Sequence, residues 1–186
     1  MQMEEQILAD GCRNGEGAAR RELYDRFAGR LMAVCMRYAG DRATAEDLLH
    51  DAFLKIYGAF DKFSYRGSGS LRAWMERITV NVALEWLRTR NRRGFTELDE
   101  GRVAATVAEP EPTSSEMASV PREVLMRFIA ELPDGYRAVF NLYCIEEYSH
   151  REIAQMLGIN EKSSSSQLFR ARTLLARRIR DYLKTH

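Results

Sequence analysis

Apolar residues recur at helical spacing along most of the chain. Steps of three and four separate the apolar positions within 23–38 and within 49–60, and again in a segment that starts at 71 and runs to about 90. The same spacing returns from 124 to 144 and from 153 to 183. No segment shows the period of two that a half-buried strand requires. The pattern predicts an all-α chain, with about four helices in each of two domains.

Charge is distributed unevenly, although the net charge of the whole chain is only +1. Residues 1–93 hold 16 basic and 13 acidic side chains, residues 94–121 hold one and six, and residues 122–186 hold 11 and 8. The middle segment also holds three of the four prolines and almost no aromatic residue. This composition is typical of a linker. We therefore expect two small helical domains, 1–93 and 122–186, joined by a flexible, extended acidic linker over 94–121.

The residue inventory argues against several classes of protein. No apolar run approaches the roughly 20 residues of a membrane-spanning helix, and the acidic first ten residues lack the apolar core of a signal peptide. We therefore expect a cytoplasmic protein. Three scattered cysteines and three unpaired histidines indicate neither a disulfide framework nor a metal site. Without a nucleophile–base pair, a phosphate-binding glycine loop or a carboxylate dyad, we expect no enzyme and no cofactor.

The segment 149–183 has the pattern of a helix-turn-helix. Ser149 and Glu152 have the spacing of a capping box, Gly158 suits a left-handed helix stop, and a second helix begins at Glu161. The second helix of this motif enters the major groove with its N-terminal part. The candidate DNA contacts are therefore Lys162, Ser165, Ser166, Phe169, Arg170 and Arg172. Helical hairpins with a glycine turn also occur in bundles that never touch DNA, so the pattern alone leaves both interpretations open.

Aromatic and basic residues are interleaved between residues 57 and 93. A polar, glycine-rich loop over 64–70 can receive an unstacked base through ring stacking and backbone hydrogen bonds. The following helix carries an asparagine and several arginines at helical spacing. Candidate contacts to a melted strand are Tyr65, Arg66, Ser68, Ser70, Arg77, Asn81, Arg88 and Arg92. Trp74 and Trp86 share the apolar face and are expected largely in the core.

Together these segments resemble the bacterial sigma factors of the extracytoplasmic-function group. The resemblance covers essentially the whole chain and is carried by the order and spacing of 22–38, 45–63, 65–93 and 132–175. It implies that the second segment docks on the largest subunit of RNA polymerase, that the third melts and recognises the −10 element, and that the fourth recognises the −35 element. The implied polymerase-binding face consists of Glu46, Asp47, Asp51, Leu54 and Tyr57.

The same resemblance implies that the linker threads a basic channel of the polymerase. It also implies three partners: core RNA polymerase, promoter DNA and an anti-sigma factor. The chain departs from the family in two places. Ser68 stands where an acidic residue usually follows Arg-Gly, and with Gly69 after it the loop is expected to be looser. In the recognition helix the positive charge stands at Lys162 rather than at position 165, where this chain has Ser165.

The sequence thus predicts an alternative sigma factor, which binds core RNA polymerase, recognises the −10 and −35 promoter elements and promotes DNA melting for transcription initiation. The alternative is a stand-alone helix-turn-helix transcriptional regulator. The first domain discriminates between them, because such a regulator needs neither a base-capturing loop nor a polymerase-binding helix. A helical interaction protein, a third possibility, would leave Asn81 and the 64–70 loop without a purpose.

Overall fold

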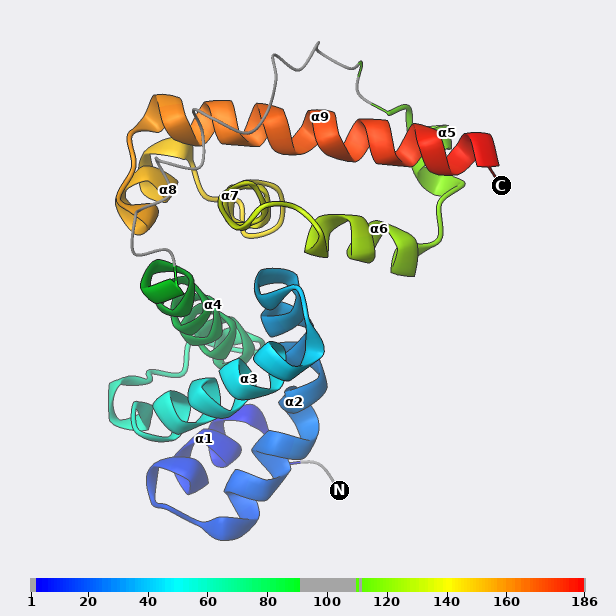
Figure 1. Ribbon diagram of the computed structural model, residues 1–186. Helices are drawn as coiled ribbons and strands as arrows, with labels where there is room; N and C mark the ends of the chain where they lie inside the picture. Colours follow the sequence, from blue (N-terminus) through cyan, green and yellow to red (C-terminus); the bar gives the residue numbers. More distant parts are fainter. Residues whose placement is uncertain (1–2, 91–109, 111, 186) are drawn as a thin grey trace. The chain divides into compact units, whose positions relative to one another are not determined.

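Helices form all the regular structure in the described part of the chain. The computed structural model describes residues 3–90, 110 and 112–185. The prediction of an all-α chain is confirmed (Figure 1). The chain forms two compact units, Met1–Ala83 and Leu84–His186, and the division falls within a helix. The domain limits 1–93 and 122–186 remain predictions.

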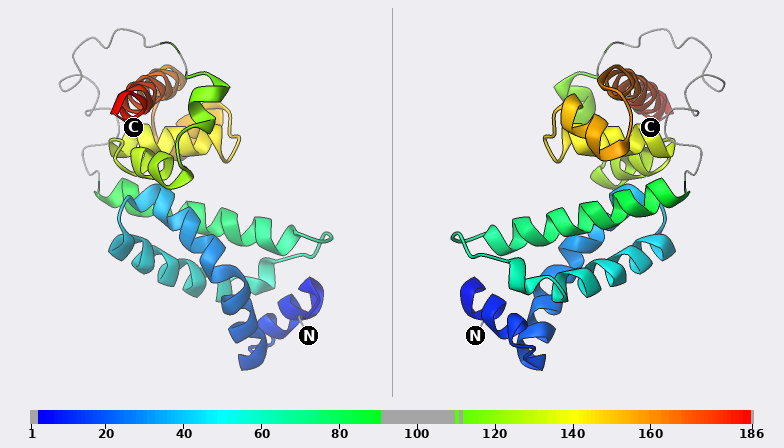
Figure 2. Two further views of the ribbon diagram at one scale, coloured as in Figure 1. Left: turned by 90° about the vertical axis from the view of Figure 1, so that its right-hand side faces the viewer. Right: turned by 90° about the vertical axis from the view of Figure 1, so that its left-hand side faces the viewer.

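The first unit is built around the helix α2, which packs against both α1 and α3 (Figure 2). The predicted apolar stripe of α2 is buried throughout. Asp41 begins α3 by accepting a hydrogen bond from the Thr44 N–H at 2.9 Å. The elements are α1 (Glu5–Arg13), α2 (Gly17–Ala39), α3 (Arg42–Tyr57), the short 3-10 helix η1 (Phe60–Lys62) and the part of α4 (Ser70–Arg90) up to Ala83.

The helix α1 is absent from the sequence-based prediction. It docks on α2 through Leu8 and Cys12, which are almost completely buried. The two backbones approach closely at Gly11, where an added Cβ would lie 2.7 Å from the Cβ of Ala19. Glycine is therefore required at this position to keep α1 seated.

The second unit is organised around its long last helix. Four shorter helices pack against it or against one another (Figure 1). The centre of its core consists of Leu132, Tyr136, Ala171 and Leu175. Buried Arg137 donates to the Ala130 and Leu132 carbonyls and pairs with Asp134 at 2.7 Å, which joins α6 to α7. The elements are α5 (Ser114–Ala118), α6 (Arg122–Ala130), α7 (Asp134–Cys144), α8 (His150–Leu157) and α9 (Glu161–Thr185).

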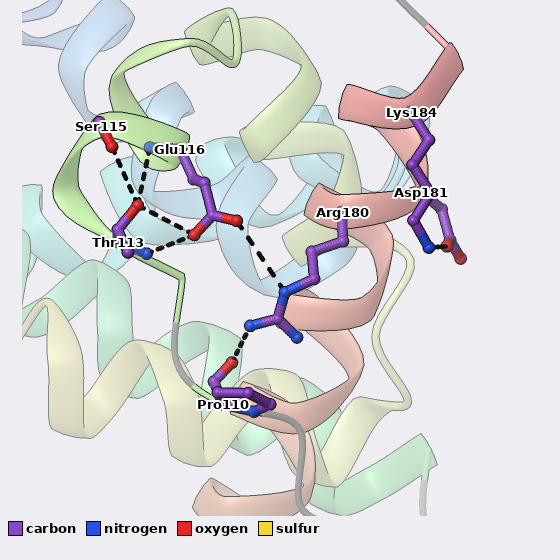
Figure 3. Close-up of polar contacts among 7 residues, drawn as sticks. All are labelled: Pro110, Thr113, Ser115, Glu116, Arg180, Asp181 and Lys184. Carbon is purple, nitrogen blue, oxygen red and sulfur yellow. Dashed lines mark hydrogen bonds and ion pairs between the residues drawn. The ribbon is translucent and has the colours of Figure 1, made fainter.

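The structure differs from the predicted extended linker in its last part. Residues 94–109 and 111 lie outside the described residues, but α5 is helical. The Thr113 hydroxyl and the Glu116 carboxylate form a reciprocal capping box at the start of α5. The spacing of these two residues indicates a helix start, but the acidic, proline-rich composition favoured a linker. Glu116 also lies 4.0 Å from Arg180 of α9, whose guanidinium donates to the Pro110 carbonyl (Figure 3). This end of the predicted linker is therefore tied to α9.

Candidate nucleic-acid interface

The loop between η1 and α4 bends at two glycines. Gly67 has φ +110° and Gly69 has φ +84°, both in the left-handed region that favours glycine. The Arg66 N–H donates to Ser70 Oγ at 3.1 Å, so Ser70 ties the loop to the first turn of α4. The side chains that the loop exposes are Ser64, Tyr65, Arg66 and Ser68. Tyr65 is 40% exposed, which leaves a ring face available for stacking.

The helix that follows the loop carries a polar face. Four of the exposed side chains of α4 form this face: Arg77, Asn81, Glu85 and Arg88. Steps of four, four and three place them along one side of α4. Guanidinium groups suit phosphates, whereas an amide can pair with a base edge. Arg92, predicted as a further contact, lies outside the described residues.

Trp74 and Trp86 are half-buried, so both lie less deeply in the core than the sequence predicts. The Trp74 ring lies 5.2 Å from that of Phe60 and 4.9 Å from that of Phe63, measured between centroids. This aromatic cluster lies where the chain enters the loop. Trp74 therefore supports the loop from within, and Tyr65 remains the stacking candidate.

The predicted polymerase-binding residues on α3 are exposed, with one exception. Glu46, Asp47, Asp51 and Leu54 are exposed, and Leu54 exposes 58% of its surface. Tyr57 is half-buried: its hydroxyl donates to the Arg20 carbonyl at 3.1 Å, and burial raises its pKa. Tyr57 is therefore less exposed than the other residues of the predicted face, because the last turn of α3 lies against α2, and its contact with polymerase remains a prediction.

The helix-turn-helix has the local structure that its sequence predicts. The Glu152 N–H donates to the Ser149 hydroxyl at 3.3 Å, and the Ser149 N–H donates to the Glu152 carboxylate at 2.8 Å. The hydrogen bonds from the Ser149 hydroxyl and N–H hold the pKa of Glu152 below its usual value. Gly158 ends α8 with φ +68°, and Asn160 accepts from the Ser163 N–H at 2.7 Å to begin α9. The capping box, the glycine stop and the asparagine cap are confirmed.

The start of α9 presents a mixed polar and aromatic face. The exposed predicted contacts are Lys162, Ser165, Phe169 and Arg172, and the half-buried ones are Ser166 and Arg170. Phe169 is 51% exposed, which is a large apolar surface for a side chain on a solvent-exposed helix face. Ser165, expected at the edge of this face, is exposed. The opposite side of α9 is buried, as its apolar stripe predicts.

Two residues that the sequence analysis missed connect α1 to the loop region. The Glu5 carboxylate accepts from the Gly69 N–H at 2.8 Å. The Arg13 guanidinium donates to the Phe63 carbonyl at 3.0 Å and to the Phe60 carbonyl at 3.3 Å. The step of four between Leu8 and Cys12 could have indicated a helix, but nothing in the sequence indicates that this helix contacts the loop region.

The described residues offer no metal-binding cluster of three or more histidine, cysteine or carboxylate side chains. Within the same ranges no helix has the length and apolar character needed to cross a membrane. Burial raises the pKa of Cys12 to about 11 and that of Cys35 to about 12. Cys144 is exposed, because it is the last residue of α7.

Comparisons with known proteins agree with this arrangement. Residues 23–93 match the family described as Sigma-70 region 2, and residues 122–175 match Sigma-70, region 4. The chain is 30% identical over 153 residues to the RNA polymerase sigma factor YlaC of Bacillus subtilis. This match covers 81% of this chain and 86% of YlaC. It is 25% identical over 194 residues to the ECF RNA polymerase sigma-E factor of Escherichia coli K12, covering 98% of each.

A third relative is longer than this chain. The chain is 28% identical over 165 residues to the ECF RNA polymerase sigma factor SigE of Mycolicibacterium smegmatis. The match covers 89% of this chain but only 62% of that relative. Both sigma regions nevertheless occur in this chain: region 2 contains the exposed loop, and region 4, which follows it, contains the helix-turn-helix. The chain belongs to the extracytoplasmic-function group of bacterial RNA polymerase sigma factors.

Proposed function

We propose that this protein acts as an alternative sigma factor, a regulatory protein that gives core RNA polymerase its promoter specificity. One observation carries the proposal: a loop with an exposed aromatic ring and a helix-turn-helix with an exposed N-terminal face occur in the same chain. A factor that must both capture a melted base and bind duplex DNA needs both features.

The 64–70 loop and the polar face of α4 recognise the −10 element and stabilise its melted strand. Tyr65 supplies a stacking surface beside the exposed guanidinium of Arg66. Ser68 and Ser70 offer hydroxyl groups, although Ser70 Oγ already accepts from the Arg66 N–H. Asn81 lies farther along α4 and pairs with a neighbouring base edge. The arginines of the same face follow the phosphates.

The exposed face of α3 binds core RNA polymerase. Exposed carboxylates at positions 46, 47 and 51 precede the exposed Leu54 on α3, so the face combines negative charge with an apolar side chain. Such a face suits a basic helical partner with an apolar stripe. Glu46 contributes less, because it pairs with Arg42 at 2.8 Å.

The start of α9 recognises the −35 element as duplex DNA. Short side chains at 165 and 166 permit a close approach to the groove, and Lys162 and Arg172 reach phosphates on either side. The proposed cytoplasmic location follows from these partners. An anti-sigma factor that holds the protein inactive is a further proposed partner, on the strength of family membership.

Transcription with purified components tests the proposal. The protein is mixed with core RNA polymerase and total genomic DNA, and the transcripts are sequenced; core enzyme alone is the control. Transcript starts that share upstream −10 and −35 elements, and that need both components, are the expected result. Tight, sequence-specific duplex binding by the chain alone, without new transcript starts, would support the stand-alone regulator instead.

A further inference from the structure

We infer that α1 is a clamp for the base-receiving loop and that Glu5 is a positioning residue for −10 recognition. The inference rests on the proposed function of the 64–70 loop. It concerns how that loop keeps its conformation before DNA arrives.

The first contact lies at the end of the loop. The Glu5 carboxylate accepts from the Gly69 N–H at 2.8 Å, although the two residues are 64 positions apart in sequence. Gly69 has φ +84° and is the last residue before α4, so its orientation sets how the chain passes from the loop into α4. A charged acceptor on a backbone N–H makes a stronger hydrogen bond than a neutral one. Glu5 thus holds the loop at its C-terminal end.

The second contact lies at the beginning of the loop. Arg13, at the other end of α1, donates to the carbonyls of Phe60 and Phe63. Phe63 immediately precedes the loop and is buried against the ring of Trp74. One helix therefore holds both ends of the loop: its Glu5 and Arg13 side chains bind main-chain atoms there.

The clamp is itself rigidly placed. Leu8 and Cys12 are almost completely buried, and the close approach at Gly11 leaves no space for a larger residue. A helix seated in this way transmits its position to Glu5 and Arg13. Their contacts to the loop are then consequences of packing rather than of two mobile surface side chains.

The clamp also compensates for the missing acidic residue at Ser68 of the loop. Ser68 and Gly69 were expected to loosen the loop, because no loop residue after Arg66-Gly67 is acidic. Glu5 brings a carboxylate to this point from another helix. A loop held in its receiving conformation loses less entropy when a base binds, so base capture becomes both stronger and more selective.

Amide exchange of Gly69 in the free, full-length protein tests the contact directly. In Glu5→Ala the Gly69 amide should exchange about fivefold faster, the size expected for a lost charge-assisted hydrogen bond at a partly exposed site. Glu5→Gln keeps an acceptor oxygen and should lie between. Glu4→Ala, a neighbouring exposed carboxylate, is the matched control. Unchanged Gly69 exchange in Glu5→Ala, with the amides of α1 still protected, overturns the clamp.

Base selectivity in the holoenzyme tests the positioning role. Holoenzymes with wild-type, Glu5→Ala, Glu5→Gln, Glu4→Ala or Tyr65→Ala protein bind pre-melted −10 templates that carry each of the four bases at every melted position in turn. Glu5→Ala should reduce the preference for the best base about threefold to tenfold, with partial recovery in Glu5→Gln and normal assembly with core enzyme.

The outcomes separate the inference from the proposed function. If Tyr65→Ala loses base preference while Glu5→Ala matches Glu4→Ala, the clamp is wrong and base capture stands. If Tyr65→Ala keeps full preference, base capture by this loop is wrong, and the role assigned to Glu5 falls with it. Loss of preference in both variants, with Glu4→Ala unaffected, supports the inference.

Discussion

His150 and Ser164 are joined across the turn of the helix-turn-helix. The Nδ1 atom of His150, the first residue of α8, lies 2.9 Å from Oγ of Ser164 in the first turn of α9. Ser164 is completely buried, and the imidazole ring stacks on Tyr143 with 4.6 Å between centroids. The contact therefore links three helices and fixes the start of the recognition helix relative to α8.

Removal of this link should loosen the recognition helix. Ser164→Ala deletes one buried hydrogen bond and should lower the free energy of unfolding of the second unit by about 1 kcal/mol. Urea titration of the full-length protein, followed through the amide signals of α8 and α9, measures the change. Ser165→Ala, at the adjacent exposed position, should change stability by less than about 0.5 kcal/mol. Equal effects of the two substitutions would contradict the structural role of Ser164.

Loss of the stacking ring should impair melting more than binding. Tyr65→Ala and Asn81→Ala should each slow open-complex formation, and for the ring the loss corresponds to about 1–3 kcal/mol. Assembly with core polymerase should remain normal, because both residues lie off α3. Stopped-flow measurement on duplex and pre-melted promoters checks this, and the pre-melted template should restore most of the rate. Failure of that rescue would count against base capture.

Charge reversal on α3 should prevent assembly with polymerase. Asp47→Arg with Asp51→Arg replaces two exposed carboxylates on the proposed docking face by cations, without touching the buried stripe of the helix. Far-UV circular dichroism should be unchanged, whereas co-elution with core enzyme should be lost. Asp25→Arg reverses an exposed charge on α2 and serves as the control. Normal co-elution of the folded double mutant would show that this face of α3 does not bind polymerase.

A positive charge at the start of α9 should strengthen −35 binding. Ser165 is exposed there, so Ser165→Arg adds a phosphate or guanine contact. The slope of log affinity against log salt should steepen by about one unit, and Arg170→Ala should have the opposite effect. Thr185→Arg adds the same charge about 30 Å away along the helix and should change little. Identical salt slopes for wild type, Ser165→Arg and Arg170→Ala would mean that this face does not meet DNA.

The three cysteines should differ in reactivity. Cys144 is exposed, whereas burial raises the pKa of Cys12 from 9.0 to about 11 and that of Cys35 from 9.0 to about 12. The thiolate is the reactive form, so at pH 8 iodoacetamide should label Cys144 first. Peptide mapping by mass spectrometry measures the order, and labelling in urea should remove it.

The same two thiols make stability sensitive to high pH. Their pKa values are higher in the folded than in the unfolded protein, so the neutral form favours folding. Their contribution is fully present below pH 9 and is lost as the pH rises towards about 11 and 12. Cys35→Ala should reduce this loss in urea titrations between pH 8 and pH 11.

The sequence by itself determined most of the helices, although neither α1 nor α5 was predicted. Apolar residues at steps of three and four predict α2, α3 and α9 correctly, because one buried stripe per helix is a local property. The capping box at Ser149 and the glycine at 158 place the ends of α8 for the same reason: each acts within one helical turn. The exposure of Asp47 and Ser165 also follows from spacing.

Tertiary structure decided which side chains are free to act. Tyr57 has a sequence position typical of an outer face, yet its hydroxyl donates a hydrogen bond to the Arg20 carbonyl of α2, and the Arg20 guanidinium lies 5.3 Å from the centre of its ring. The contact from Glu5 to Gly69 joins residues 64 positions apart, and Glu5 lies on a helix that packs closely on α2 at Gly11. Helical periodicity states which face of a helix is buried, but not which helix buries it. The geometry of the loop region therefore depends on packing between distant segments, which no local pattern encodes.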